Sequence, residues 1–271
     1  MMAHRHNKIM EILSQHSRAE VNVLAELMEV SQVTIRKDLD ILEERGLVRR
    51  EHGYASLNKW ENAGKRMAIN YDIKRRIAKI AATIVEEGET VMIESGSCCA
   101  FLAEELANAQ KDITIITNSV FIANYIRHAS RTQIILLGGY FQPESQVVVG
   151  PMTSKCGEIF FSDKFFIGTD GYIPGFGFTG KDHLRSHTIM DLAENAREIY
   201  VLTDSEKFQR QGVLGVVQLD KIAGVFTDDR IPVDIETQLL ENKIELYKVS
   251  EKEQKIPKLN CRKQQTEQCV S

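Results

Sequence analysis

The chain lacks any apolar segment long enough to cross a membrane. No uninterrupted apolar run approaches the ~20 residues that a membrane-spanning helix needs. The first six residues have no apolar core, which is unlike a secretory signal peptide. Hydrophobic residues make up 43% and charged residues 27% of the 271 positions, as is ordinary for a globular protein. We therefore expect a cytoplasmic protein with no membrane partner.

Cysteine is scarce and irregularly spaced. Cys98 and Cys99 are adjacent, and no pair of the five cysteines has the spacing of a zinc site. The other three are Cys156, Cys261 and Cys269. An odd number without a regular framework indicates reduced thiols. His183 and His187 would share a helix face, but no third ligand accompanies them, so we expect neither a metal nor a cofactor.

An excess of positive charge is also missing. The chain has 34 Lys and Arg against 38 Asp and Glu, a formal net charge of −4. Nine basic residues are matched by nine acidic ones within residues 1–60. Binding to nucleic acid needs only a local patch, however, and Arg36, Lys37, Arg49 and Arg50 are candidates for one. The balance of charge therefore does not exclude a nucleic-acid partner.

The most informative pattern lies in residues 30–39, VSQVTIRKDL. Ile35, Leu39 and Leu42 repeat at i, i+4 and i+7, which predicts a helix with one apolar face. Ser31 is placed to cap the first turn with its hydroxyl. The residues off the apolar face are free to contact a partner, and they are Gln32, Thr34, Arg36 and Lys37.

Two helices are predicted before this one, over residues 7–16 and 21–28. Two residues separate the second of them from Ser31, which is the spacing of a helix-turn-helix. Gly46 suits the position just beyond the end of the third helix. In such a unit the amino end of the last helix enters the major groove of DNA.

Residues 47–57 predict two short strands around a glycine turn, which together form a wing. We expect Arg49, Arg50 and His52 at its tip to lie against phosphates. We expect Asp38 to orient the neighbouring cations of the reading helix rather than to contact DNA. A small helical bundle without a nucleic-acid role is the alternative interpretation of residues 1–57.

The rest of the chain predicts a second domain, over residues 71–250. Residues 58–70 are polar without a sustained period and predict a linker, and a helix is expected over residues 71–86. Short β-branched runs then alternate with helical stretches. We expect strands at residues 90–93, 113–117, 133–137, 164–168, 199–203, 224–227 and 245–249, and helices at 99–106, 120–129, 183–195 and 234–242. This alternation predicts a mostly parallel sheet covered on both faces, a three-layer α/β domain. Residues 251–271 predict a disordered tail.

Small polar residues follow three of the predicted strands. Ligands of open α/β sheets lie beyond the carboxyl ends of the strands, and helix N-termini favour anions. We therefore expect one anion pocket at this edge, although each residue could instead be only a cap or a turn. The residues are Ser95, Gly96, Ser97, Asn118, Ser119 and Gly139.

Residues 5–57 resemble the winged helix-turn-helix of the DeoR family of bacterial transcriptional regulators. Residues 30–39 are similar to that family's V-S-x-x-T-I-R-[RK]-D-L, residues 42–46 to its L-E-x-x-G, and residues 50–53 to its R-x-H-G. Two positions depart from the pattern: Glu20 stands where the second helix usually begins with Ser or Thr, and Tyr54 replaces a second glycine of the wing. The resemblance implies double-stranded DNA as a partner. We expect its contacts to come from Ser31, Gln32, Thr34, Arg36, Lys37, Arg50 and His52.

The second domain resembles the DeoR-family effector domain, which is similar to the ribose-5-phosphate isomerase fold. Residues 94–97 stand in the place of D-x-G-[ST], 117–119 of T-N-S, 168–171 of G-x-x-G, and 204–208 of D-x-x-K-F. The resemblance implies a phosphorylated-sugar effector that releases the protein from its operator. Besides the loop residues above, the expected effector contacts are Glu94, Asp170, Lys181, Arg185 and Lys207. Many family members have an E-x-x-x-K pair near Arg185, and this chain lacks that pair. Glu94 stands where the family has an aspartate, and it either reaches a different hydroxyl of the effector or meets Lys207.

Two classes of function remain. The first is a repressor of carbohydrate-metabolism genes that binds paired operator half-sites as a homo-oligomer. We expect such a repressor in the bacterial cytoplasm, and on the nucleoid when it is bound to its operator. The second is a sugar-phosphate isomerase or lyase with an accessory DNA-binding domain. Glu94 and Asp170 are the candidate bases for such an enzyme, but neither is paired with a second acid by an obvious motif. We therefore expect a regulator and no enzymatic activity.

Overall fold

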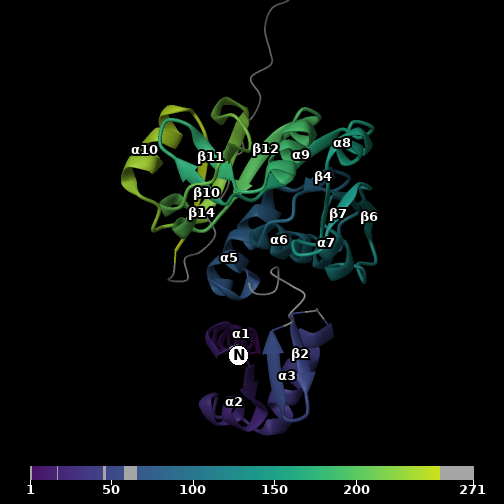
Figure 1. Ribbon diagram of the computed structural model, residues 1–271, viewed down its shortest axis with the longest axis vertical. Helices are drawn as coiled ribbons and strands as arrows, with labels where there is room; N and C mark the ends of the chain where they lie inside the picture. Colours follow the sequence, from purple (N-terminus) through teal and green to yellow (C-terminus); the bar gives the residue numbers. More distant parts are fainter. Residues whose placement is uncertain (1, 17, 45–46, 58–65, 251–271) are drawn as a thin grey trace, which may run out of the picture.

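The computed structural model describes residues 2–16, 18–44, 47–57 and 66–250. They form an N-terminal domain of helices with a small sheet, and a larger α/β domain (Figure 1). Three expectations lie wholly or partly outside the described residues: the helix end at Gly46, the linker over residues 58–65, and the disordered tail over 251–271.

Helices and a small antiparallel sheet make up the N-terminal domain. The helices are α1 (Met2–His16), α2 (Val21–Leu27) and α3 (Gln32–Glu44). The strands are β1 (Arg18–Glu20), β2 (Val48–Glu51) and β3 (Tyr54–Leu57), in the order β1-β3-β2. The predicted apolar face is confirmed, because Ile35, Leu39 and Leu42 are completely buried against Ile9 and Leu24. Only β1 was not expected, since three residues are too few to show a period of two.

A seven-stranded parallel sheet forms the centre of the larger domain. Its strands are β4 (Thr90–Ile93), β5 (Ile113–Thr117), β6 (Thr132–Leu136), β9 (Ser162–Ile167), β12 (Ala196–Leu202), β14 (Ile222–Asp228) and β15 (Glu245–Val249). Each corresponds to a predicted strand, with ends shifted by a few residues. The order is β15-β14-β12-β9-β4-β5-β6, so β4 to β6 extend in one direction and β9 to β15 in the other. The direction of winding therefore reverses between β4 and β9.

Helices cover both faces of this sheet (Figure 1). On one face lie α5 (Tyr71–Ala81), which continues as η1 (Ala82–Ile84), α6 (Ser97–Asn108) and α7 (Val120–Tyr125). On the other lie α9 (His183–Ala193) and α10 (Val233–Glu241). Successive strand residues alternate between the two cores: Phe166 packs with the first set, and Phe165 and Ile167 pack with the second. The predicted three-layer architecture is confirmed.

Several short elements on the second face were not expected. They are the hairpin β7 (Tyr140–Gln142) and β8 (Val147–Val149), α8 (Pro151–Gly157), and a second antiparallel sheet of β10 (Gly171–Ile173), β11 (Gly177–Gly180) and β13 (Leu214–Gly215), with the 3-10 turns η2 (Ser205–Gln209) and η3 (Leu219–Lys221). Each is too short to show a clear period. They matter for the site, because the second sheet and η2 lie beside the carboxyl ends of the strands.

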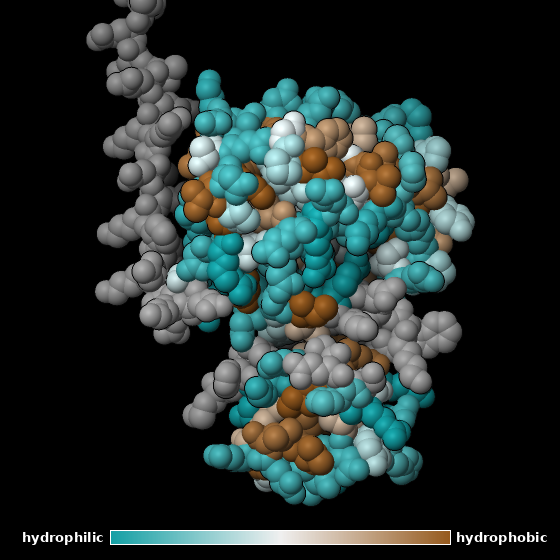
Figure 2. All heavy atoms as spheres, turned by 60° about the vertical axis from the view of Figure 1, so that its left-hand side comes forward, coloured by the Kyte–Doolittle hydropathy of each residue, from teal (hydrophilic) through white to brown (hydrophobic). Residues whose placement is uncertain are grey.

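The outer surface fits a protein whose apolar residues lie mainly inside. Figure 2 shows a largely hydrophilic face, with apolar side chains gathered in a few areas on both domains. Among the described helices, none combines the length and apolar character needed to cross a membrane.

Candidate functional site

The amino end of α3 is built as the sequence predicted. The Ser31 hydroxyl accepts a hydrogen bond from the Thr34 amide at 3.2 Å and lies 2.9 Å from the Thr34 hydroxyl, so the predicted cap is confirmed. Thr34 is partly buried, Ile35 is buried, and four other side chains of the first turns are exposed. These are Gln32, Val33, Arg36 and Lys37. Val33, which is 61% exposed, was not expected there; an apolar side chain on this surface could meet a thymine methyl group.

Asp38 has a different role from the one predicted. Its side chain is buried and accepts hydrogen bonds from Arg5 Nε at 2.7 Å and Arg5 Nη2 at 3.1 Å. His6 Nε2 lies 3.1 Å from the same carboxylate. The prediction that Asp38 orients Arg36 or Lys37 is therefore wrong, because a residue on the buried side of α3 points away from them. Asp38 instead fixes α1 to the reading helix.

The wing is tied to α3 through Arg50. Its amide donates to Glu43 Oε1 at 2.8 Å, and its guanidinium is paired with Asp40. Contact of this guanidinium with a phosphate would therefore have to replace an existing ion pair. His52 is exposed at the tip, beside Gly53, whose φ of 77° is in the left-handed region that glycine adopts without strain.

The two departures from the DeoR pattern in this domain contact each other. Glu20 and Tyr54 are opposite each other in the β1–β3 pairing, and the Tyr54 hydroxyl donates to Glu20 Oε1 at 2.7 Å. Glu20 makes no side-chain cap on α2; the Gly53 carbonyl accepts the Val21 amide at 2.9 Å instead. The wing turn thus satisfies the first amide of α2, although a Ser or Thr at position 20 would bond the second or third amide instead.

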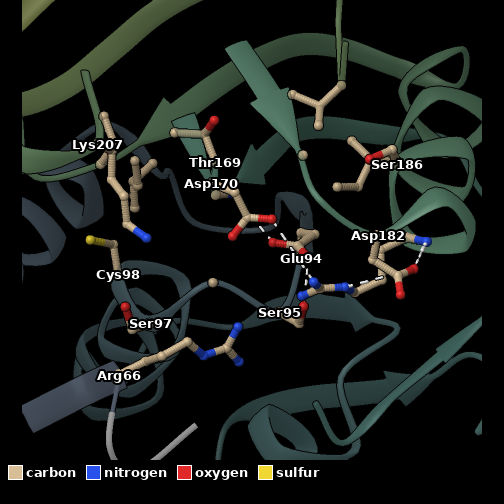
Figure 3. Close-up of a pocket in the computed structure, with 18 of the residues that line it drawn as sticks. Arg66, Glu94, Ser95, Ser97, Cys98, Thr169, Asp170, Asp182, Ser186 and Lys207 are labelled. Atoms are coloured by element: carbon tan, nitrogen blue, oxygen red, sulfur yellow. Dashed lines mark hydrogen bonds and ion pairs between the residues drawn. The ribbon is translucent and has the colours of Figure 1, made fainter. Parts of the chain in front are cut away.

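A polar cleft of the α/β domain opens between the ends of β4 and β9. In open α/β sheets this is where ligands bind, because the loops after the two strands run to opposite faces and leave a crevice. The cleft is lined by the loop after β4 (residues 94–98), the loop after β9 (168–170), the end of β12 with η2, and the start of α9 (Figure 3). Arg66, Gly180, Asp182 and Val216 also line it.

Two glycines allow the loops to meet at the floor of the cleft. A Cβ on Gly96 would lie 3.1 Å from the Gly168 Cα, and a Cβ on Gly168 would lie equally close to the Gly96 Cα. Gly96 also begins α6 and provides no side-chain cap, so the first amides of that helix keep free hydrogen-bonding capacity. The arrangement brings a helix N-terminus and its partial positive charge to the cleft.

Four carboxylates line the cleft, and each is held in a different way. Glu94 is buried and accepts hydrogen bonds from the Ser95 hydroxyl and, at 3.3 Å, from the Gly168 amide, so it does not meet Lys207. Asp170 accepts the Lys181 amide at 3.0 Å. Asp182 caps α9 through the Arg185 amide at 2.8 Å. The fourth is Asp204. Burial opposes ionisation of Asp182, but its hydrogen bonds from Arg185 and Gln142 outweigh this and lower its pKa.

Three cations face these acids. Arg185 lies 3.9 Å from both Asp170 and Asp182, too far for direct hydrogen bonds. Burial lowers the pKa of Lys207, and nearby Asp170 and Asp204 oppose this effect. Burial also lowers the pKa of Arg66, with a further contribution from Arg185. The Nε atoms of Arg66 and Arg185 are buried without a hydrogen-bond partner among the described residues.

The structure brings together seven of the expected effector residues and separates four. Those lining the cleft are Glu94, Ser95, Gly96, Ser97, Asp170, Arg185 and Lys207. Asn118, Ser119, Gly139 and Lys181 do not line it. Asn118 bonds Val148 of β8 through both its backbone and its side chain, Ser119 caps α7, and Gly139 packs against Thr153.

Topology explains why a single pocket for all of these residues was the wrong expectation. Residues 118–119 and 139 follow β5 and β6, the first and second strands beyond β4 on the side away from β9. The β7–β8 hairpin occupies the space beyond those strand ends. Lys181 contributes only its amide, to Asp170, and its side chain is exposed.

Sequence reasoning missed three charged residues of the cleft: Arg66, Asp182 and Asp204. Arg66 was expected in a linker, because residues 58–70 show no sustained period. Asp204 was already part of the D-x-x-K-F segment, and its place directly after a predicted strand was the available signal. Asp182 stands immediately before a predicted helix, which marks it as a cap.

The cleft offers neither a reactive thiol nor a metal site. Burial raises the pKa of Cys98, which lines the cleft, to about 12, so its thiol is protonated at neutral pH. Within the described part of the chain, no three His, Cys, Asp or Glu side chains gather as a metal ion would require.

Comparison with known proteins decides the family. The DeoR-like helix-turn-helix domain matches residues 5–61, and the DeoR C terminal sensor domain matches residues 69–229. The chain belongs to the DeoR family. The resemblance inferred from residues 30–39 and from the strand-end motifs is therefore confirmed, and this DeoR-family protein is a transcriptional regulator with a helix-turn-helix for DNA.

Curated relatives agree with this assignment along nearly their whole length. A putative aga operon transcriptional repressor of Escherichia coli O157:H7 is 28% identical over 91% of this chain and 94% of its own. The glycerol-3-phosphate regulon repressor of E. coli K12 is 29% identical over 89% and 97%. The L-fucose operon activator of Haemophilus influenzae is 26% identical over 87% and 95%. These relatives are named as regulators, and we class the DeoR-family chain with them rather than with enzymes.

Solved structures show weaker likenesses. A ribose 5-phosphate isomerase A from Methanocaldococcus jannaschii is 21% identical over 51% of this chain and 55% of its own, with a TM-score of 0.38. A likeness at this level is too weak to assign a fold or a function to the DeoR-family chain.

Proposed function

We propose that this DeoR-family regulator is a repressor of carbohydrate-metabolism genes that a phosphorylated sugar releases from its operator. The observation that carries the proposal is that one cleft holds cations and carboxylates together with the amino end of α6. Arg66, Ser97 and Lys207 lie around the start of α6, and Asp182 lies farther along the cleft with Arg185 3.9 Å from it (Figure 3). A ligand that carries both an anionic group and hydroxyl groups finds partners for each in such a cleft.

The phosphate would lie at the start of α6. Charge-assisted hydrogen bonds from guanidinium and ammonium groups are among the strongest in proteins, and helix amides add to them. The Lys207 ammonium makes no hydrogen bond that the described residues show, and Arg66 Nε has none, so both have donors to offer. The sugar hydroxyls would donate to Asp170 and Asp182, as neutral donors do to ionised acceptors.

The names of the relatives support the carbohydrate assignment. Two of the three described above are repressors, and their names refer to the aga operon, a glycerol-3-phosphate regulon and an L-fucose operon. We propose that this chain acts likewise in the bacterial cytoplasm, as a homo-oligomer on paired half-sites, because a two-fold assembly presents two reading helices about one turn of DNA apart.

The ligand class is tested by thermal unfolding of the full chain. The panel is glycerol 3-phosphate, ribose 5-phosphate, fructose 1-phosphate and galactose 6-phosphate, each beside its unphosphorylated parent. A ligand at about 100 times its Kd stabilises the folded state by about 2.7 kcal/mol, which raises the Tm of a domain of this size by roughly 5–10 °C. Equal behaviour of every phosphate and its parent would reject the proposed ligand class.

The regulatory action is tested on DNA selected by the full chain from a random duplex library. We expect enrichment of paired half-sites about 10 base pairs apart, and release from that DNA by the same phosphate that raises the Tm. Conversion of the phosphate by the protein would favour the isomerase alternative instead. Selection of single half-sites, with a monomer in light scattering, would contradict the proposed homo-oligomer.

A further inference from the structure

Arg66 links the cleft to the part of the chain that joins the two domains. It is the first described residue after β3 of the wing ends at Leu57, so only residues 58–65 lie between them. Its guanidinium nevertheless reaches into the cleft, on the side of Ser97 (Figure 3). A residue at the start of the sensor domain therefore forms part of the proposed ligand site.

The backbone of Arg66 is joined to the same cleft by a second route. The Lys74 ammonium, on α5, donates to the Arg66 carbonyl at 2.6 Å. The same ammonium is buried and lies 3.7 Å from Asp204 Oδ2, and Asp204 lines the cleft. The other oxygen of Asp204, Oδ1, is buried without a hydrogen-bond partner in the described part of the chain. Residue 66 is thus attached to the cleft wall through its main chain as well as its side chain.

The residues that follow are fixed in the sensor core. Met67 and Ala68 are buried, and Asn70, with a φ of 54°, sets the turn into α5. A shift of Arg66 therefore cannot be absorbed on its carboxyl side, where the chain is packed. Such a shift would act on the amino side of Arg66, from which the chain leads back to the wing.

The Arg66 guanidinium lies among the other charged groups of the cleft. Arg66 and Arg185 repel each other, which contributes with burial to the lowered pKa of Arg66. Glu94 and Asp170 offset part of this repulsion without any hydrogen bond to the Arg66 Nε. An anion between the two guanidiniums would convert the repulsion into attraction and fix Arg66 in the cleft. Because a ligand shifts a conformational equilibrium only through such differential contacts, Arg66 has the properties of a coupling residue.

We propose that Arg66 binds the anionic group of the effector and that Arg66, held on its carboxyl side by the packed residues 67–70, transmits ligand occupancy to the DNA-binding domain. This inference rests on the proposed function, since it assigns the regulation of the same cleft. It attributes the release of DNA to a residue outside the strand-end loops that form the rest of the site.

The test uses the full chain with Arg66→Gln, and Arg197→Gln as the matched control. Arg197 is exposed on β12 and pairs with Asp163 at 3.0 Å, at the amino ends of the strands and away from the cleft. The probe is the panel phosphate that raises the wild-type Tm most, used at concentrations that saturate the Tm shift of each variant. Operator affinity is measured with and without it, and the ratio of the two affinities is compared between variants.

We expect the phosphate to weaken operator binding of the wild type and of Arg197→Gln by about 5- to 150-fold, the usual range of allosteric coupling. In Arg66→Gln the phosphate should still raise the Tm, at higher concentration, but should change operator affinity by less than about 3-fold, a residual below that range. Arg66→Lys, which keeps the charge but not the planar fork, should restore part of the release. It also serves as the test variant should the glutamine form not fold.

Two results would overturn the inference, and they differ from each other. Full release of DNA from Arg66→Gln saturated with the phosphate would remove Arg66 from the coupling and leave the proposed function standing. If Arg66→Gln does not fold, full release from Arg66→Lys has the same meaning, provided that its phosphate affinity is unchanged. Failure of every panel phosphate to raise the wild-type Tm would reject the proposed ligand class and this inference together.

Discussion

Replacing Asp38 by asparagine tests how the reading helix is held. The carboxylate accepts two hydrogen bonds from Arg5 and faces His6, and its side chain is only 2% exposed. Hydrogen bonds to charged groups contribute about 1.5–3 kcal/mol each. The Arg5 side chain is 19% exposed and can regain some water when its partner is lost. The asparagine oxygen can also still accept one bond, so we expect a net loss of about 2–3 kcal/mol.

Asp40→Asn is the matched control, because it makes the same change two residues along the same helix. Asp40 is 51% exposed and its partner Arg50 is 33% exposed. Exposed ion pairs contribute at most about 1 kcal/mol. The loss in free energy of unfolding of the N-terminal domain should therefore be larger for Asp38→Asn than for Asp40→Asn by about 1 kcal/mol or more. This corresponds to about a five-fold difference in an equilibrium constant.

The assay is native-state hydrogen exchange of the full chain, read at buried amides of α1 and α3 such as those of Ile9, Leu13 and Leu39. Exchange reports the local free energy of opening. A loss of 2–3 kcal/mol should speed exchange in Asp38→Asn by about 30- to 150-fold, while amides of β4 in the sensor domain should not change. Equal acceleration in Asp38→Asn and Asp40→Asn would refute the view that Asp38 fixes α1 to α3.

Three further predictions address the two functional surfaces. Arg36→Ala should weaken binding to the selected operator by about 1–3 kcal/mol if Arg36 contacts a base edge; unchanged binding to operator and random DNA in an anisotropy titration would remove it from the interface. Because the pKa of Lys207 is lowered, its positive charge is lost at a lower pH than that of an ordinary lysine. Affinity for the stabilising phosphate should therefore fall on the alkaline side in the wild type but not in Lys207→Met, and parallel pH profiles in calorimetry would contradict this. The pKa of Cys98, raised to about 12, predicts slow alkylation by iodoacetamide at pH 8; mass spectrometry showing Cys98 modified as fast as the partly exposed Cys156 would contradict it.

Local patterns in the sequence predicted most of the elements correctly. The spacing of Ile35, Leu39 and Leu42 indicated one face of α3, and β-branched runs marked the parallel strands with ends a few residues off. Such patterns exist because each helix or strand must bury one face, and the residues on that face recur with the period of the element. Strands of two or three residues, such as β1 and β13, contain too few residues to show any period.

Pairings between distant residues could not be predicted in the same way. The sequence places Asp38 beside Arg36 and Lys37, but the helix turns it toward Arg5 on another element. Glu20 and Tyr54 looked like separate departures and prove to be partners across two strands. Neither pair has a sequence spacing that a local pattern could reveal, because each depends on how separate elements pack.

The sequence by itself determined the two-domain plan, the cap and exposed face of the reading helix, and the polar loops at the strand ends. These follow from interactions between residues a few positions apart. Only the tertiary structure decided which loops share a cleft, because that depends on the reversal of strand order between β4 and β9. The β7–β8 hairpin, which covers the end of β5, keeps Asn118 and Ser119 out of that cleft. The packing of residues 66–70 beside α5 brings Arg66, which sequence analysis assigned to a linker, to the ligand site.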